Sequence, residues 1–230
     1  MKQKLNPPPT GLVLEIGSGD NPHARSDILC DRFISDDTER GGSIVIDRPL
    51  VVADAHHLPF KDGAFVYTIC SHILEHMDEP EQFARELRRV SPAGYIQSPS
   101  EIAERLFHWS FHRWYVNLIG DRLVLHPKEP AEPFGELFDY LYEYNSAYYF
   151  FQRSMPDLFW VEREWHGDLQ IEVRDTSPLP LHDPETLRNL AQPRFALPQL
   201  ILLFFGALLT RIARANVRRQ VRSWVRRSYV

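Results

Sequence analysis

The 230-residue chain is poor in the residues that build disulfide-rich or metal-cluster folds. It has two cysteines, Cys30 and Cys70, so a disulfide framework is not expected and a reducing compartment is favoured. No group of Cys and His residues has the spacing of a metal site, and we therefore predict no bound metal. Residues 1–10 lack the apolar stretch of a secretion signal and are expected to form a flexible leader.

Basic residues are also scarce over most of the chain. The formal net charge is −5, but residues 211–230 contain seven arginines and no acid. The remaining 210 residues hold 19 basic and 31 acidic side chains, a net charge of −12. An acidic body of this kind is a poor nucleic-acid binder, so no nucleic-acid partner is expected.

The central motif of the chain is LVLEIGSGDNP at residues 12–22. Its apolar run ends at two closely spaced glycines, which predicts a buried parallel strand that leads into a tight turn. Gly17 and Gly19 allow the backbone to approach a ligand that a Cβ would keep away. The alternative is an ordinary turn after a strand, because a G-x-G pattern alone has a high false-positive risk.

Three later apolar runs end beside an acidic or polar residue. They lie at residues 28–31, 50–54 and 65–70, and the last is followed by Ser71. The first of them begins only nine residues after Gly19. A parallel crossover with a full helix usually needs a dozen or more residues, so the first crossover helix is expected to be short or missing.

A helix is predicted at residues 80–90, because Phe83, Leu87 and Val90 fall on one helical face. A further strand is predicted at residues 95–97. Strands that alternate with loops and helices predict an α/β fold, with a Rossmann-like, mostly parallel sheet, helices on both faces and shortened first crossovers. Ligands of such sheets bind at the carboxyl ends of the strands, where the glycines and acids of the four runs would meet.

Three segments of residues 12–100 resemble class I S-adenosylmethionine-dependent methyltransferases of the type 11 group. They are LEIGSG at 14–19, ADAHHLPF at 53–60 and FVYTICSHILEHMDEPEQFARELRRV at 65–90. The third is the most specific, because it joins a strand, the triplet LEH and an acidic helix start that contains proline. The resemblance implies S-adenosylmethionine as cofactor and a methyltransferase activity.

The resemblance also implies roles for individual residues. The implied cofactor-binding residues are Glu15, Gly17, Ser18, Gly19, Asp31, Asp54, Ala55 and Ser71. The glycine segment would line the methionine end, Asp31 would accept from the ribose hydroxyls and Asp54 from the adenine amino group. Asp47, which also follows an apolar run, is the rival for the ribose. The chain departs from the family in the short crossovers and at Pro22, near which another glycine is common.

Histidines after the fourth strand are the candidates for catalysis. His72 and His76 would border the methyl-transfer face, and histidine is the commonest general base near neutral pH. His76 has an alternative structural role, because similar methyltransferases with different substrates share the LEH triplet. His108 and His112 can share a helix face, and with no third ligand at a suitable spacing we predict packing or substrate contact there rather than a metal.

Residues 11–100 would form the cofactor-binding core and residues 101–175 the acceptor side. The expected acceptor-side elements are a helix at 101–109, a hairpin over 113–126, a long helix at 132–153 and closing antiparallel strands at 159–164 and 169–173. Residues 134–165 hold twelve aromatic side chains, which form either a lid that selects the acceptor or a face that packs on the sheet. Residues 176–193 are rich in proline and are predicted to be a linker.

The C-terminal segment is predicted to be a membrane-associating helix over residues 194–230. Residues 195–210 carry no charge, but sixteen residues fall short of the ~20 that span a bilayer. The arginine-rich residues that follow suit an anionic surface on the cytosolic side. We therefore predict a peripheral or monotopic anchor on the cytoplasmic face; the alternative is a helix that docks on the sheet or at a dimer interface.

Two functions in different classes remain. The preferred hypothesis is O-methylation of a membrane-proximal acceptor, such as a lipid-linked glycan or a lipid headgroup. The competing hypothesis is a non-catalytic membrane-associated binding or assembly protein on a degenerate methyltransferase fold, which the short crossovers suggest. A nicotinamide dehydrogenase is disfavoured, because G-x-G-x-x-G requires a glycine where Pro22 stands.

Overall fold

The computed structural model describes residues 5–36, 42–128, 137–180, 183–192, 195–206, 208, 209 and 212. The strands are β1 (Val13–Ile16), β2 (Ile28–Asp31), β3 (Leu50–Val52), β4 (Tyr67–Ser71), β5 (Ala93–Pro99), β6 (Trp114–Ile119), β7 (Arg122–Pro127), β8 (Trp160–His166) and β9 (Ile171–Val173). The helices are the 3₁₀ turn η1 (Leu74–His76), α1 (Pro80–Val90), α2 (Glu101–Phe107), α3 (Leu137–Tyr144), α4 (Ser146–Ser154), α5 (Pro156–Phe159) and α6 (Pro184–Leu190).

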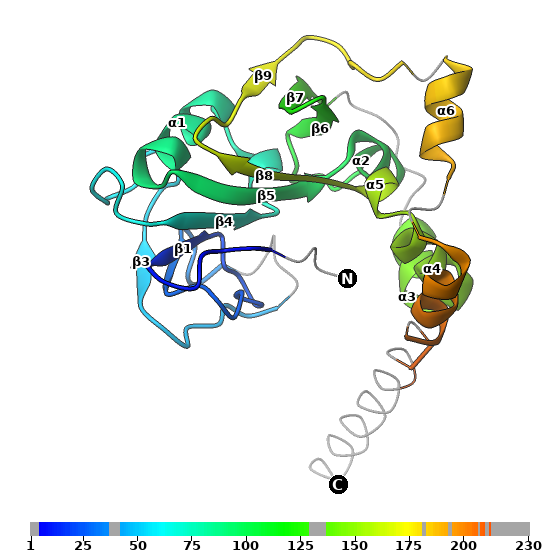
Figure 1. Cartoon of the computed structure of the whole chain (residues 1–230), viewed down its shortest axis with the longest axis horizontal. Helices are drawn as coiled ribbons and strands as arrows, with labels where there is room; N and C mark the ends of the chain where they lie inside the picture. Colours follow the sequence, from blue (N-terminus) through cyan, green and yellow to red (C-terminus); the bar gives the residue numbers. More distant parts are fainter. Residues whose placement is uncertain are drawn as a thin grey trace, which may run out of the picture.

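The main sheet has six strands in the order β3-β2-β1-β4-β5-β8 (Figure 1). The first five are parallel, and β8 closes the edge antiparallel to β5. Ile16 pairs with both Cys30 and Cys70, so the carboxyl ends of the three central strands lie level. The strand order reverses between β1 and β4, where ligands of doubly wound sheets bind. The predicted Rossmann-like, mostly parallel sheet is confirmed.

Helix α1 covers one face of this sheet and has the bounds predicted from its periodicity. Phe83, Leu87 and Val90 are fully buried in the main hydrophobic core, beside Leu14 and Ile96 of the strands. The opposite face carries a smaller cluster that includes Val13 and Tyr67, and Leu5 of the N-terminal segment packs against it. Leu5, which falls in the predicted flexible leader, therefore contacts this cluster.

The first crossover lacks a helix, as its length predicted. All residues between β1 and β2 are described, and they form only turns and bends. The buried carboxylate of Glu15 accepts hydrogen bonds from the His23 N–H (2.7 Å) and from the Ser26 hydroxyl. Arg48 donates to the carbonyls of the same two residues. Side chains thus satisfy backbone groups that a crossover helix would have paired internally.

Strands β6 and β7 form the predicted hairpin, but the last strand does not join the main sheet. β9 pairs parallel with β7 in a separate three-stranded sheet, and only β8 closes the main sheet. The prediction of two closing strands was therefore wrong for residues 169–173. The short turn at Gly167, whose φ is +74°, leads the chain away from β8 toward β7.

The long helix predicted at residues 132–153 is two helices in the described part of that range. Asn145 separates α3 from α4, with an extended backbone and a side chain that accepts the Tyr148 N–H at the start of α4. Asn competes in this way with helical hydrogen bonding, so it favours helix starts over helix interiors. Residues 132–136 lie outside the described residues.

The C-terminal segment is helical over residues 197–206 and at 208, 209 and 212. Several of its apolar side chains are strongly exposed, among them Leu202 at 73% and Phe205 at 55%. Phe204 makes an edge contact with Phe150 of α4, at 5.5 Å between ring centroids. Within the described ranges, no helix combines the length and apolar character that crossing a membrane requires. Residues 213–230, including most of the predicted basic stretch, lie outside the described residues.

Candidate functional site

A cavity of about 700 Å³ lies at the carboxyl ends of the central parallel strands. The structure brings all ten predicted site residues together in its lining. They are Glu15, Gly17, Ser18, Gly19, Asp31, Asp54, Ala55, Ser71, His72 and His76. Residues from four strand ends thus converge on one cavity, although they are spread over more than sixty positions in the sequence.

The glycine turn after β1 forms the floor of the cavity at the switch point. Gly17 has a φ of +67°, and a Cβ at this position would lie 1.8 Å from Cδ1 of Ile73. Gly19 has a φ of +52°, and a Cβ there would meet nothing closer than a carbonyl oxygen at 4.0 Å. Both positions have the left-handed backbone conformation that favours glycine. Only at Gly17 would a side chain also collide with a neighbour, Ile73.

Asp31 at the end of β2 is tied to this turn. Its Oδ2 accepts the Gly19 N–H (3.3 Å) and its Oδ1 the Phe33 N–H (3.1 Å), and the side chain lines the cavity. The rival acid, Asp47, forms an ion pair with Arg48 at the surface and is absent from the lining. The geometry therefore favours Asp31 over Asp47 as the acid nearest the glycine turn.

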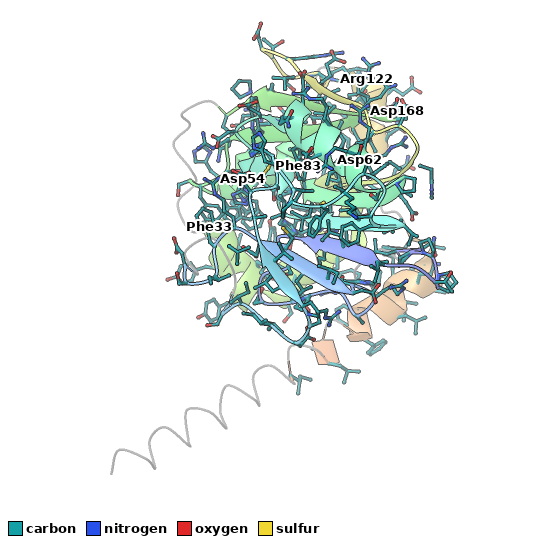
Figure 2. All side chains as sticks on the ribbon, turned by 90° about the vertical axis from the view of Figure 1, so that its left-hand side faces the viewer. Phe33, Asp54, Asp62, Phe83, Arg122 and Asp168 are labelled. Carbon is teal, nitrogen blue, oxygen red and sulfur yellow. The ribbon has the colours of Figure 1, made fainter. Side chains whose placement is uncertain are left out.

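Asp54 lies beyond β3, at a neighbouring position on the cavity wall. Its carboxylate accepts hydrogen bonds from the His56 N–H (2.9 Å) and ring Nδ1 (2.7 Å), and Arg32 lies 3.4 Å away. The backbone hydrogen bond is the largest cause that lowers the pKa of Asp54, so this carboxyl is ionised at neutral pH. Figure 2 shows Asp54 and Phe33 on the same side of the molecule.

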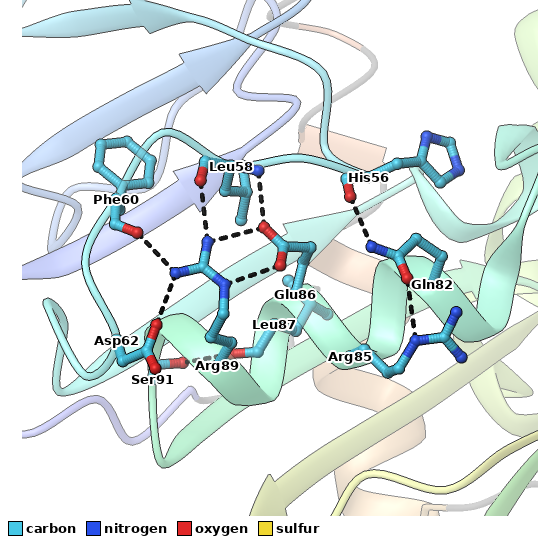
Figure 3. Close-up of polar contacts among 10 residues, drawn as sticks. All are labelled: His56, Leu58, Phe60, Asp62, Gln82, Arg85, Glu86, Leu87, Arg89 and Ser91. Carbon is cyan, nitrogen blue, oxygen red and sulfur yellow. Dashed lines mark hydrogen bonds and ion pairs between the residues drawn. The ribbon is translucent and has the colours of Figure 1, made fainter.

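A polar network on α1 fixes the segment that follows Asp54 (Figure 3). Glu86 accepts the Leu58 N–H (2.7 Å), and Arg89 donates to both of its carboxylate oxygens (2.7 and 2.8 Å). Arg89 also donates to the carbonyls of Leu58 and Phe60. The Arg89 guanidinium holds the pKa of Glu86 below its usual range. The helix thereby anchors the loop that carries the predicted adenine-binding residues.

Ser71 and His72 form the rim of the cavity at the end of β4. His72 has a φ of +59°, a conformation that costs a side-chain-bearing residue free energy and is common at functional sites. Its ring is nearly half exposed, packs edge-on against Trp160, and places Nδ1 3.3 Å from Oε1 of Glu75. His72 therefore presents an accessible imidazole to the cavity.

His76 lies deeper, among side chains that the sequence did not assign to a site. Its ring stacks on Phe111 and meets the His112 ring edge-on, with 4.7 Å between the two centroids. Phe111, His112 and Trp109 line the cavity from the connection between α2 and β6. His112 was predicted to pack or to contact substrate. Its contact with the His76 ring was not predicted.

The aromatic residues of α3 and α4 do not form this wall. No described residue beyond Arg113 lines the cavity. Phe138 instead contacts Phe107 of α2, and Phe151 contacts Phe159 of α5. Of the two interpretations of the aromatic segment, a lid over the cavity is wrong for the described residues. Phe138 and Tyr148 pack against the cluster formed by α2 and α5, Trp165 lies in the main core, and Tyr140 and Tyr144 are exposed.

Both cysteines are buried and unbonded near the cavity floor. Burial is the main cause that raises the pKa of the Cys30 thiol to about 12, and burial also places the pKa of Cys70 well above its usual value. Neither thiol is therefore available as a nucleophile at neutral pH.

Residues 31–96 match the model of a family described as "Methyltransferase domain". The match covers 66 of the 230 residues, less than a third of the chain. The match confirms the resemblance to class I S-adenosylmethionine-dependent methyltransferases and, with it, S-adenosylmethionine as the cofactor of the fold.

Individual methyltransferases match over part of their length. Ajmaline N-methyltransferase of Rauvolfia serpentina is 42% identical over 43 residues, which are 19% of this chain and 15% of that protein. An S-adenosylmethionine-dependent methyltransferase from Mesorhizobium loti is 13% identical, with a TM-score of 0.35 over 54% of this chain and 60% of the other. A possible histamine N-methyltransferase from Thermotoga maritima is 22% identical, with a TM-score of 0.31 over 44% and 48%. The chain thus spans less than two thirds of each of these proteins.

The residues of the cavity fit S-adenosylmethionine chemically. The cofactor is cationic at its sulfonium and amine and carries two ribose hydroxyls, and the cavity offers carboxylates at the ends of β1, β2 and β3. Gly17 and Gly19 leave the floor without side chains. Asp31 and Asp54 each accept hydrogen bonds from the protein, but a carboxylate has about four acceptor positions and retains capacity for a ligand.

Proposed function

We propose that the protein is an S-adenosylmethionine-dependent methyltransferase that methylates an oxygen of a membrane-proximal acceptor. The single observation that carries the proposal is the convergence of the glycine turn, Asp31, Asp54 and His72 on one cavity. When bound, S-adenosylmethionine supplies an electrophilic methyl group. Methyl transfer to a hydroxyl then needs alignment and a base.

The chain's own residues would divide these tasks. The turn at residues 17–19 would hold the methionine end, Asp31 the ribose and Asp54 the adenine amino group. His72 is the candidate for the base, because its ring is accessible from the cavity and Glu75 lies 3.3 Å from Nδ1. His76 is more enclosed and is better suited to shape the acceptor end beside Phe111.

An acceptor at the cytoplasmic face of a membrane would explain the C-terminal helix. Its exposed apolar side chains include Leu202 and Phe205. Their exposure to water is unfavourable, and insertion into a membrane interface would bury them. A lipid-linked glycan or a lipid headgroup would bring an oxygen nucleophile to a protein anchored in this way. Membrane association is supported by this exposure and by the arginine-rich sequence of residues 211–230.

The cofactor assignment can be tested by calorimetric titration of two aspartate variants. Asp54→Ala should weaken S-adenosylmethionine binding by about tenfold to a hundredfold, because it removes a charged acceptor. Asp47→Ala is the matched control, since Asp47 lies at the surface outside the cavity, and it should bind like wild type. An affinity of Asp54→Ala within twofold of wild type would exclude the adenine role.

The membrane assignment has its own test with anionic phospholipid vesicles. The full chain should sediment with the vesicles, and Leu202→Glu/Phe205→Glu should remain in the supernatant. Leu187→Glu is the control, because Leu187 on α6 is also exposed, at 46%, but lies outside the C-terminal helix. Equal sedimentation of both variants would show that the anchor lies elsewhere.

The helix-free first crossover favours one competing function, a non-catalytic binding protein on a degenerate methyltransferase fold. It shortens the segment after the glycine turn, where doubly wound folds usually place a helix N-terminus that binds an anionic group. That protein could bind S-adenosylmethionine but would not convert it. Release of S-adenosylhomocysteine in the presence of membrane glycolipid extracts, beyond the rate without them, would contradict this alternative.

A further inference from the structure

A cluster of potential metal ligands lies at the inner end of the cavity. One ring nitrogen or carboxylate oxygen from each of Glu75, His76 and His112 lies within 4.8 Å of the other two. Glu75 and His76 belong to η1, whereas His112 comes from the connection between α2 and β6. The fold therefore brings His112 to two adjacent residues that precede it by more than thirty positions, which is why a search for ligand spacing predicted no metal.

His112 is oriented in the way that metal-binding histidines usually are. Its Nδ1 lies 2.6 Å from Oε2 of Glu104, a carboxylate that is only 1% exposed. The other oxygen of Glu104 accepts a hydrogen bond from Lys128 Nζ (2.5 Å). With Nδ1 donating to Glu104, the lone pair of His112 is on Nε2. Such a carboxylate–histidine pair fixes the tautomer and raises the basicity of the ligating nitrogen.

Glu75 is a buried carboxylate with unused acceptor capacity. Its side chain is 1% exposed, and its Oε2 accepts the Ser98 hydroxyl at 3.0 Å. Its Oε1 accepts no hydrogen bond of normal geometry, although His72 Nδ1 lies 3.3 Å away. A buried carboxylate is costly unless charge and hydrogen bonds compensate it, and a cation beside Oε1 would provide that compensation.

We propose that Glu75, His76 and His112 bind a divalent transition-metal ion at the inner end of the cavity. Two imidazoles and one carboxylate are the ligand set of catalytic zinc sites and of non-haem iron sites with open positions. The ion would be reached from the cavity, because His76 and His112 both line it, whereas Glu75 is buried and is not among the lining residues. Zn²⁺ is the first ion to test.

The geometry requires only a small adjustment. Zinc–nitrogen and zinc–oxygen bonds of about 2.1 Å place tetrahedral ligands roughly 3.4 Å apart. The three donor atoms are separated by at most 4.8 Å. Side-chain rotations that move each donor atom by about an ångström would therefore bring all three within bonding distance of an ion. The remaining coordination position would face the cavity and accept an oxygen of the acceptor. This last role rests on the proposed function, whereas binding of the ion does not.

The inference is tested on the full chain after chelator treatment and buffer exchange. Calorimetric titration with Zn²⁺ alone should give one site per chain, and Co²⁺ should give the visible absorption of a low-coordinate histidine complex. His112→Ala and Glu75→Gln should each weaken Zn²⁺ binding at least a hundredfold. His57→Ala is the control, because His57 is exposed and is absent from the cavity lining, and it should match wild type.

The variant Glu104→Gln distinguishes a metal site from a cluster of side chains that only pack together. It should preserve the one-to-one stoichiometry but weaken Zn²⁺ binding by about tenfold to a hundredfold, the usual effect of losing an outer carboxylate. Circular dichroism of each variant establishes that it is folded. A wild-type site no tighter than millimolar, or equal Zn²⁺ affinity in wild type, His112→Ala and Glu104→Gln, would overturn the inference.

The same samples distinguish this failure from failure of the proposed function. S-adenosylmethionine binding without Zn²⁺ binding would refute the metal site and leave the methyltransferase proposal in place. Zn²⁺ binding without S-adenosylmethionine binding would support the metal site and contradict the methyltransferase proposal.

Discussion

The two glycines of the turn after β1 should respond differently to the same substitution. Gly19→Ala adds a Cβ into open space, so its cost is that of the left-handed backbone alone, roughly 1–2 kcal/mol. Gly17→Ala has the same backbone cost, but its Cβ would also lie 1.8 Å from Cδ1 and 2.4 Å from Cγ1 of Ile73. Overpacking of this kind adds about 1–3 kcal/mol. Gly17→Ala should therefore lower the free energy of unfolding by about 1–3 kcal/mol more than Gly19→Ala does.

Urea denaturation of a double-mutant cycle measures the difference. Ile73→Ala removes both atoms that the new Cβ would meet, so Gly17→Ala should cost about 1–3 kcal/mol less in the Ile73→Ala background than in wild type. No such coupling should appear between Gly19→Ala and Ile73→Ala. Equal stability of the two glycine variants, or no coupling of either to position 73, would show that Ile73 does not restrict residue 17.

Three further outcomes follow from the structure. Cys30 and Cys70 should not react with a thiol reagent at about pH 8 in the folded protein, because burial raises the pKa of each thiol. Both should react in denaturant. Rapid reaction of the native protein would contradict their burial. Glu86→Gln should cost about 1.5–3 kcal/mol near pH 7. Since the folded state lowers the pKa of Glu86, this stabilisation by Arg89 is present above the usual pKa of 4.5 and is lost as the pH falls through the folded-state pKa; a cost that is constant down to about pH 3 would argue against the ion pair. Asn145→Ala should cost about 1 kcal/mol by removing the cap of α4, and Asn145→Asp should restore most of it in the same denaturation assay.

The cofactor half of the site could be predicted from the sequence because its signals are local. Each of the strands β1, β2 and β4 is a short apolar run, and its carboxyl end is marked by a glycine, an acid or Ser71. Parallel pairing of such strands places their ends at one edge of the sheet without further information. The same local reasoning gave the bounds of α1, whose buried face repeats with helical period.

The end of the cavity around Glu75, His76 and His112 could not be predicted in this way because its contacts are tertiary. Glu75 and His112 meet only because β5 and α2 return the chain toward η1. The aromatic periodicity that suggested one long helix continues through Asn145, where a side-chain hydrogen bond begins a new helix instead. β9 carries the pattern of a strand, but that pattern contains no information about which sheet it joins.

The most direct test of the account is calorimetric titration of the purified full chain with S-adenosylmethionine and, separately, with S-adenosylhomocysteine. We expect one site per chain with micromolar affinity for both, because the two molecules share the groups that residues 15–19, Asp31 and Asp54 would bind. If the folded protein bound neither molecule, the cavity would not be a cofactor site, and the proposed methyltransferase function would be contradicted.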